Sequence, residues 1–139
     1  MRQTKACGVF VVRGDPVDSF LILVHPKRLD VPKGHVDAGE SEIECALREL
    51  EEETGVSAAE IELDPGFRFS IQYQVPPASP DAGPCQKTLV IFLGRLTRDV
   101  PIRLTEHIGY RWCDWNPPHS IQVQTIDPLL KEVERYLLA

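Results

Sequence analysis

The sequence predicts a single α/β domain in which a mixed β-sheet is packed between α-helices. Three observations predict it: five short apolar runs typical of strands, two segments with helical spacing and end signals, and a total length of 139 residues. A chain of this length buries one sizeable core but is too short to divide comfortably into two. We therefore expect one domain over residues 1–139.

The first two of the expected strands are adjacent. Both are apolar and rich in branched side chains, and residues 14–16, with a glycine and a proline, supply the turn between them. Later in the chain, residues 76–84 hold four prolines and a glycine, so this segment must be a loop. Because it is long for a connection, we expect it to border the functional site. The five expected strands cover residues 5–13, 19–25, 66–75, 87–96 and 107–113.

Two helices are predicted from their end signals. The first begins at Ser41, which matches a capping box with Glu44, and ends at Gly55, where a left-handed residue terminates a helix. The second begins at Asp127, a cap residue followed by a proline, and continues through Leu137. Strands combined with two separated helices favour a mixed sheet between them. The apolar stripe of the first helix is expected at Ile43, Ala46, Leu47 and Leu50.

Negative charge is concentrated in one segment of the chain. Residues 40–55 hold seven acids against one base, a balance of -6 that equals the formal net charge of the whole chain. Such a protein does not attract nucleic acid over a wide face, because that binding needs a basic patch. A small anionic ligand can still bind where cations bridge it to the acids.

Three of these acids share one face of the first helix, because Glu49, Glu52 and Glu53 fall at i, i+3 and i+4. Like charges at this spacing cost roughly 0.2 to 0.5 kcal/mol per pair, so the helix gains nothing by gathering them. A divalent cation would reverse the sign of that cost, and oxygen ligands suit magnesium or manganese. The metal would neutralise a polyphosphate and activate water for attack on phosphorus. On spacing alone, a solvated acidic face is the favoured alternative.

The residues from Gly34 to Val56 resemble the complete Nudix box. The pattern is Gly, five residues of any type, Glu, seven of any type, Arg-Glu, an apolar residue, one of any type, Glu-Glu, one of any type, Gly and an apolar residue. No position departs from it. The resemblance implies a Nudix fold, an α/β/α sandwich, and hydrolysis of a nucleoside diphosphate linked to another group.

The resemblance also implies roles for residues within the box. Arg48 and Glu40 match the family's orienting residues. Arg48 lies four residues from both Glu44 and Glu52, so its guanidinium can orient a carboxylate. The implied metal ligands are Glu49, Glu52, Glu53 and the Gly34 carbonyl.

Outside the box, the likeness narrows to the asymmetric diadenosine tetraphosphate hydrolases. Residues 32–36, Lys87-Thr88 and residues 102–112 are similar to that subfamily. Lys33 would then meet a phosphate as a point charge, and Glu106 would be an extra metal ligand or the base that takes a proton from water. The structural alternatives are an ordinary surface lysine and a solvated loop acid.

Further candidates for substrate contact are one histidine and one aromatic residue. His35 is a candidate phosphate contact, although a hydrogen-bonded structural role is favoured for it and for His107. Stacking of a base on an aromatic ring contributes roughly 1 to 3 kcal/mol. Tyr73 is the favoured ring for this contact, whereas Trp112 is assigned to the core.

The leading hypothesis is a magnesium- or manganese-dependent hydrolase of dinucleoside polyphosphates. The chain lacks the subfamily's tryptophan before Pro32 and its tyrosine after Thr88. ADP-ribose, nucleoside triphosphates, inositol pyrophosphates and capped RNA therefore stay open as substrates, although the acidic balance disfavours RNA. A non-catalytic nucleotide sensor is the third possibility, and the intact carboxylates argue against it.

The remaining expectations concern location and partners. No apolar run approaches the roughly 18 residues of a membrane span, and residues 1–5 lack the apolar segment of a secretory signal. We therefore expect a cytoplasmic protein with no membrane partner. Its expected partner is a small-molecule nucleotide, and either a monomer or a homodimer is compatible with the sequence.

Overall fold

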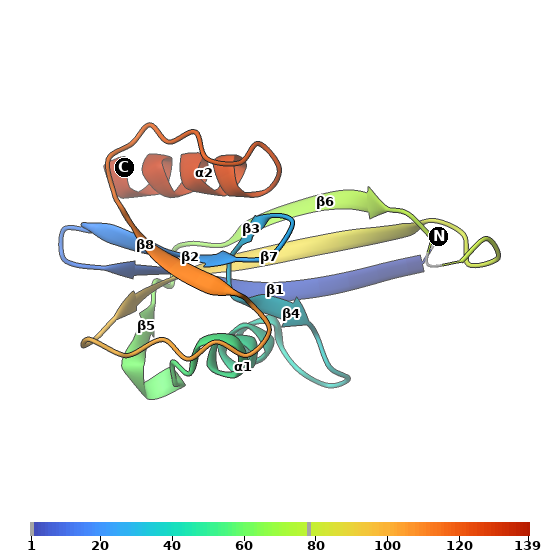
Figure 1. Cartoon of the computed structure of the whole chain (residues 1–139), viewed down its shortest axis with the longest axis horizontal. Helices are drawn as coiled ribbons and strands as arrows, with labels where there is room; N and C mark the ends of the chain where they lie inside the picture. Colours follow the sequence, from blue (N-terminus) through green and yellow to red (C-terminus); the bar gives the residue numbers. More distant parts are fainter. Residues whose placement is uncertain (1, 78) are drawn as a thin grey trace.

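The computed structural model describes residues 2–77 and 79–139. One eight-stranded sheet lies between α1 (Glu42–Thr54) on one face and α2 (Ile126–Leu138) on the other (Figure 1). The strands are β1 (Arg2–Arg13), β2 (Ser19–Val24), β3 (Leu29–Asp30), β4 (Lys33–His35), β5 (Ile61–Leu63), β6 (Phe69–Val75), β7 (Cys85–Leu96) and β8 (Gly109–Asp114), and a short 3-10 helix, η1 (Ala58–Glu60), precedes β5.

Two long strands, β1 and β7, run side by side through the centre of the sheet. They pair in parallel from Arg2 opposite Cys85 to Val12 opposite Arg95. Antiparallel neighbours complete the sheet: β1 pairs with β2 and β4, β7 with β5 and β6, and β2 with β3 and β8. The expected mixed sheet between helices is confirmed.

From Ala6 to Val12, both faces of β1 are buried, because alternate side chains pack against different helices. Phe10 and Val12 join the core under α2, while Val9 and Val11 join the core over α1. A strand covered on both faces has no polar side to its pattern, which explains the unbroken apolar run in the sequence.

The end signals of α1 are confirmed. The Ser41 hydroxyl accepts a hydrogen bond from the Glu44 amide at 3.1 Å, and the Glu44 carboxylate accepts one from the Ser41 amide at 2.9 Å. Gly55 ends the helix with a φ of 80°. Within the helix, Ile43 departs from the expected stripe, since it is 48% exposed and Cys45 is buried instead.

The start of α2 differs from the expected cap. The cap position is Thr125, and the Asp127 carboxylate accepts hydrogen bonds from the amides of Ile121 and Gln122 at 2.8 and 2.9 Å. Asp127 therefore holds the loop before the helix instead of capping it. None of the described helices is long and apolar enough to cross a bilayer.

The expectation that the proline-rich loop borders the site is wrong. It joins β6 to β7 at the far end of their long hairpin, beside the start of β1 and away from α1 (Figure 1). The sheet there extends beyond both helices. None of the loop's described residues lines either cavity that holds the predicted site residues.

Candidate active site

One cleft, with a cavity volume of about 520 Å³, brings together most of the predicted site residues. Helix α1 forms one wall, β4 a second, and the loop before β8 a third. The predicted residues that line the cleft are Glu49, Glu52 and Glu53 from α1, Lys33, Gly34 and His35 from β4, and Glu106 from the loop. We name this cavity the acidic cleft.

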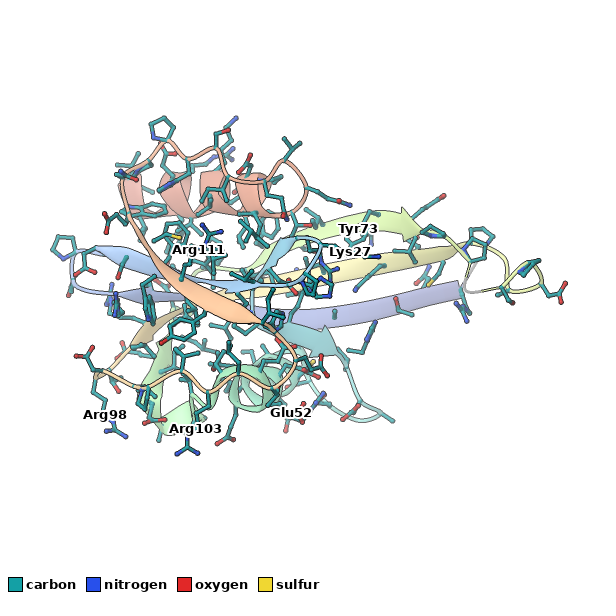
Figure 2. The ribbon with its side chains drawn as sticks, viewed as in Figure 1. Lys27, Glu52, Tyr73, Arg98, Arg103 and Arg111 are labelled. Atoms are coloured by element: carbon teal, nitrogen blue, oxygen red, sulfur yellow. The ribbon has the colours of Figure 1, made fainter. Side chains whose placement is uncertain are left out.

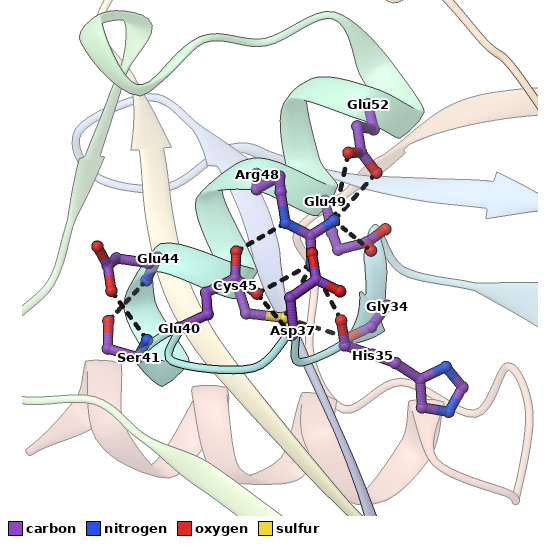
Figure 3. A network of polar contacts seen from close by, with 10 residues as sticks. All are labelled: Gly34, His35, Asp37, Glu40, Ser41, Glu44, Cys45, Arg48, Glu49 and Glu52. Carbon is purple, nitrogen blue, oxygen red and sulfur yellow. Dashed lines mark hydrogen bonds and ion pairs between the residues drawn. The ribbon is translucent and has the colours of Figure 1, made fainter.

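The guanidinium of Arg48 lies at the centre of a polar network on the α1 side of this cleft (Figure 3). It donates to both carboxylate oxygens of Glu40, at 2.7 and 3.0 Å, and to the His35 carbonyl at 3.0 Å. Its Nη1 atom donates to Glu49 at 2.9 Å and to Glu52 at 3.2 Å. The hydrogen bonds from Arg48 lower the pKa of Glu40 to about 2. Arg48 thus contacts several carboxylates, but Glu44 is engaged in the capping box instead.

The three glutamates lie on one wall, yet they are not gathered around one point. Within residues 2–77 and 79–139, no three acidic, histidine or cysteine side chains converge closely enough to hold an ion. The Nη1 atom of Arg48 donates hydrogen bonds to the carboxylates of both Glu49 and Glu52. The guanidinium compensates the like-charge repulsion that the sequence pattern implies.

The chemistry of the donor set still suits a hard divalent cation. Carboxylate and carbonyl oxygens are the ligands that magnesium and manganese prefer. Glu49 lies directly against β4, because a Cβ atom added to Gly34 would lie 2.0 Å from the Glu49 carboxyl carbon. The Gly34 carbonyl accepts a hydrogen bond from the Cys45 thiol at 3.3 Å. Glycine at this position therefore leaves room for the Glu49 carboxylate against the backbone of β4.

Glu53 is the most buried of the three carboxylates. It is 9% exposed, and its Oε1 atom accepts a hydrogen bond from the Lys33 amide at 2.9 Å. Burial raises its pKa to about 7, the negative charge of Asp30 adds to this effect, and the bond from Lys33 opposes it. At neutral pH, both protonation states of Glu53 are therefore populated, and a cation beside it would favour the charged one.

This buried carboxyl predicts a pH-dependent gain in stability for Glu53→Gln. Between the ordinary pKa of 4.5 and the folded value of about 7, the folded state binds more protons, so its stability falls as pH rises. Glutamine avoids this loss and still accepts from the Lys33 amide. In the presence of chelator, the free energy of unfolding of the variant should be higher than that of the wild type by ~1–3 kcal/mol at pH 8. At pH 4.5 the two values should differ little. Urea unfolding checks this, and an equal difference at both pH values would contradict it.

Three of the predicted residues lie at the edges of this arrangement. Glu106 is exposed at the rim of the acidic cleft, and the His35 side chain is also exposed there. Tyr73 is half-buried and lies in a second, smaller cavity of about 280 Å³ on the α2 side of the sheet. Figure 2 shows Tyr73 and Glu52 on opposite sides of the sheet. We name this second cavity the side cavity.

The two cavities share a wall that the sequence interpretation largely missed. Both are lined by Arg28, Asp30, Lys33 and Lys87. Burial lowers the pKa of Lys87, and the neighbouring positive charge of Lys33 adds to this effect. Asp30, at 7% exposure, is the acid of this wall. An acid between Leu29 and Val31 was the available signal, because a carboxylate within an apolar run must be paired if it is buried.

Trp112 is only partly buried, although it packs against the core over α1 as expected. The guanidinium carbon of Arg13 lies 3.8 Å from the centroid of its ring. This cation–π contact covers one face of the Trp112 ring.

This chain resembles known proteins over almost its whole length. The family model of the NUDIX domain matches residues 2–135. The asymmetrical bis(5'-nucleosyl)-tetraphosphatase of Rattus norvegicus is 45% identical, with 96% of this chain and 95% of that protein covered. The Mus musculus protein of the same name is 43% identical over 78% of this chain and 77% of its own length.

A solved structure shows the same arrangement of elements. The C. elegans Ap4A hydrolase binary complex superposes with a TM-score of 0.79 and 25% identity, over 97% of this chain and 98% of that one. The family match covers almost the whole chain, and enzymes of this family are generally dependent on divalent metals. The chain therefore belongs to the Nudix family of hydrolases.

Proposed function

We propose that this protein hydrolyses a phosphoanhydride bond of a dinucleoside polyphosphate such as diadenosine tetraphosphate, with magnesium or manganese as cofactor. The observation that carries the proposal is the acidic cleft, which the carboxylates of α1 and Lys33 line together. A metal-bound polyphosphate needs both charges, because the metal lies against the carboxylates and the uncompensated phosphate oxygens need a cation. The similarity to two tetraphosphatases supports the choice of substrate.

The proposed ligands of the cofactor are Glu49, Glu52, Glu53 and the Gly34 carbonyl. When bound, divalent ions would supply charge neutralisation and a water of lowered pKa. The bonds from Arg48 to Glu49 and Glu52 keep both carboxylates directed along one side of the cleft. Glu40, in turn, fixes the guanidinium with two bonds.

The other residues of the cleft act on the substrate. Lys33 binds phosphate oxygens as a point charge. Glu106, exposed at the rim, is the proposed base that takes the proton from the attacking water, and its exposure keeps it free to move toward the substrate. His35 is proposed to contact the phosphate chain where it leaves the cleft. Tyr73 is proposed to contact a base in the side cavity, which adjoins the cleft through Lys33 and Lys87.

A substrate panel read by chromatography tests the proposal. With magnesium, we expect diadenosine tetraphosphate to be cleaved to ATP and AMP with a higher kcat/KM than ADP-ribose, nucleoside triphosphates, inositol pyrophosphates or capped RNA. Excess chelator should lower turnover by at least about 10²-fold, because the neutralising charge and the activated water are lost together. Added magnesium or manganese should restore it.

Two results would contradict the proposal in different ways. Preferential cleavage of another compound in the panel would contradict the proposed substrate but not the proposed metal-dependent hydrolysis. Tight binding of nucleotide in millimolar magnesium with no hydrolysis of any compound would instead identify a nucleotide sensor.

A further inference from the structure

Asp30 lies in the shared wall between the acidic cleft and the side cavity, and four groups surround its carboxylate. The Lys33 ammonium lies 3.1 Å from Oδ1 and 3.3 Å from Oδ2. The Nε2 atom of His107 lies 3.3 Å from Oδ2, and the Arg28 guanidinium lies 3.9 Å from the same oxygen. The Val31 amide donates to Oδ1 at 2.9 Å.

The backbone that carries Asp30 is itself fixed. Strand β3 has only two residues, but Asp30 pairs with Leu23 of β2 in antiparallel register. On the other edge, the carboxamide of Gln122 accepts from the Leu29 amide at 2.8 Å and donates to the Leu29 carbonyl at 3.1 Å. A two-residue strand held from both sides can present a side chain at a defined position.

His107 depends on this carboxylate for its orientation. Its side chain is only 4% exposed, and its Nδ1 atom is buried without a hydrogen-bond partner among the described residues. The hydrogen bond at Nε2 therefore anchors the ring. Since an ionised carboxylate can only accept, this hydrogen bond requires the tautomer with the ring hydrogen on Nε2.

The Lys33 ammonium also depends on the Asp30 carboxylate for its position. A lysine ammonium is a flexible point charge on four methylene groups, and its position must be fixed from outside. The contacts of Lys33 Nζ described above are both with Asp30. The carboxylate therefore holds the ammonium at the boundary of the two cavities.

We propose that Asp30 is a positioning residue that fixes Lys33 where a phosphate chain crosses from one cavity to the other, and that locks the ring of His107 in the wall behind it. The inference rests on the proposed function, in which Lys33 binds phosphate. A carboxylate without this role should disfavour a polyanion in its vicinity. If Asp30 has no positioning role, removal of its charge should raise kcat/KM, because a repulsive charge is lost. If it positions Lys33, removal of its charge should lower kcat/KM.

The kinetic test is Asp30→Asn, in which the amide oxygen still accepts from the Val31 amide. We expect kcat/KM for diadenosine tetraphosphate to fall about 10-fold, mainly through a higher KM, because a binding interaction common to ground and transition state is weakened. Asp81→Asn, in an exposed loop, is the matched control and should leave both kcat/KM and KM at their wild-type values. An unchanged or higher kcat/KM for Asp30→Asn would overturn the proposal.

A double-mutant cycle tests whether Asp30 acts through Lys33. In a Lys33→Ala background, Asp30→Asn should have almost no further effect, because the group to be positioned is already absent. A further 10-fold loss in that background would show that Asp30 acts independently of Lys33. Thermal unfolding of each variant separates these results from a general loss of folded protein.

The second measurement needs no turnover. Nitrogen NMR of the histidine rings should show His107 with its hydrogen on Nε2 in the wild type, and a changed tautomer population in Asp30→Asn. His119, whose Nε2 atom lies 3.3 Å from the Asn116 amide, is the internal control. An unchanged His107 signal would overturn the positioning role, whether or not any substrate of the panel is cleaved. A changed signal without cleavage of any substrate would support the positioning of His107 and contradict the proposed function.

Discussion

Glu52→Gln is expected to lower kcat with diadenosine tetraphosphate by about 10²- to 10³-fold, the loss typical when a group that stabilises charge in the transition state is removed. Glutamine keeps the shape of the side chain but is a poor ligand for a divalent cation and carries no charge. The Glu52 side chain is 56% exposed, so the substitution removes no packing. Its hydrogen bond with Arg48 is an exposed pair of the kind that contributes about 0–1 kcal/mol. The variant should therefore fold normally and fail in catalysis.

Glu51→Gln is the matched control for this substitution. Glu51 is the preceding residue of the same helix and is also exposed, but it does not line the acidic cleft. Steady-state kinetics with magnesium should give wild-type values for Glu51→Gln and near-background values for Glu52→Gln, with similar unfolding transitions for both. If Glu52→Gln kept full turnover, the assignment of α1 as the metal-binding wall would be wrong.

The parts of the fold that the sequence predicted are those with local causes. The capping box of Ser41 and Glu44 and the left-handed Gly55 act within one turn of their own helix, so α1 was predicted with nearly its observed ends. The long strands β1 and β7 were recognisable because both faces are buried over residues 6–12 and 89–94, which leaves an uninterrupted apolar run in each. The presence of Glu49, Glu52 and Glu53 on one wall follows from helical spacing alone.

The parts that the sequence did not predict depend on contacts between distant segments. Strands β3 and β4 are too short for any periodicity, and they form because β2 and β1 provide edges for them. The bond between Asp30 and His107 joins residues 77 positions apart, and that between Lys33 and Glu53 joins residues 20 apart. No pattern within a window of the sequence contains both partners. The position of Arg48 between two carboxylates is likewise a consequence of rotamers, which spacing does not specify.

Gly34→Ala is expected to lower kcat/KM by at least about 10²-fold with little loss of stability, since misplacement of a reacting group by about 1 Å costs this much. The added Cβ would lie 2.0 Å from the carboxyl carbon of Glu49 and 2.2 Å from each of its oxygens. These atoms form the end of a flexible side chain, so Glu49 can rotate away at small energetic cost. The rotated carboxylate would lose its hydrogen bond with Arg48 and move away from β4, so Glu49 would be displaced from the other proposed ligands.

The same substitution elsewhere in the chain distinguishes this local displacement from a loss of fold. A Cβ on Gly8 would lie 2.1 Å from the Pro32 carbonyl oxygen, a backbone atom that cannot rotate away, so Gly8→Ala should destabilise by ~1–3 kcal/mol. A Cβ on Gly109 would lie 3.8 Å from Val24, which is an ordinary contact. Gly109→Ala should therefore have the stability and the activity of the wild type. Of the three variants, only Gly34→Ala is therefore expected to lose activity while it keeps the stability of the wild type. If its unfolding midpoint fell with that of Gly8→Ala, the lost activity would reflect a disturbed sheet and would say nothing about Glu49.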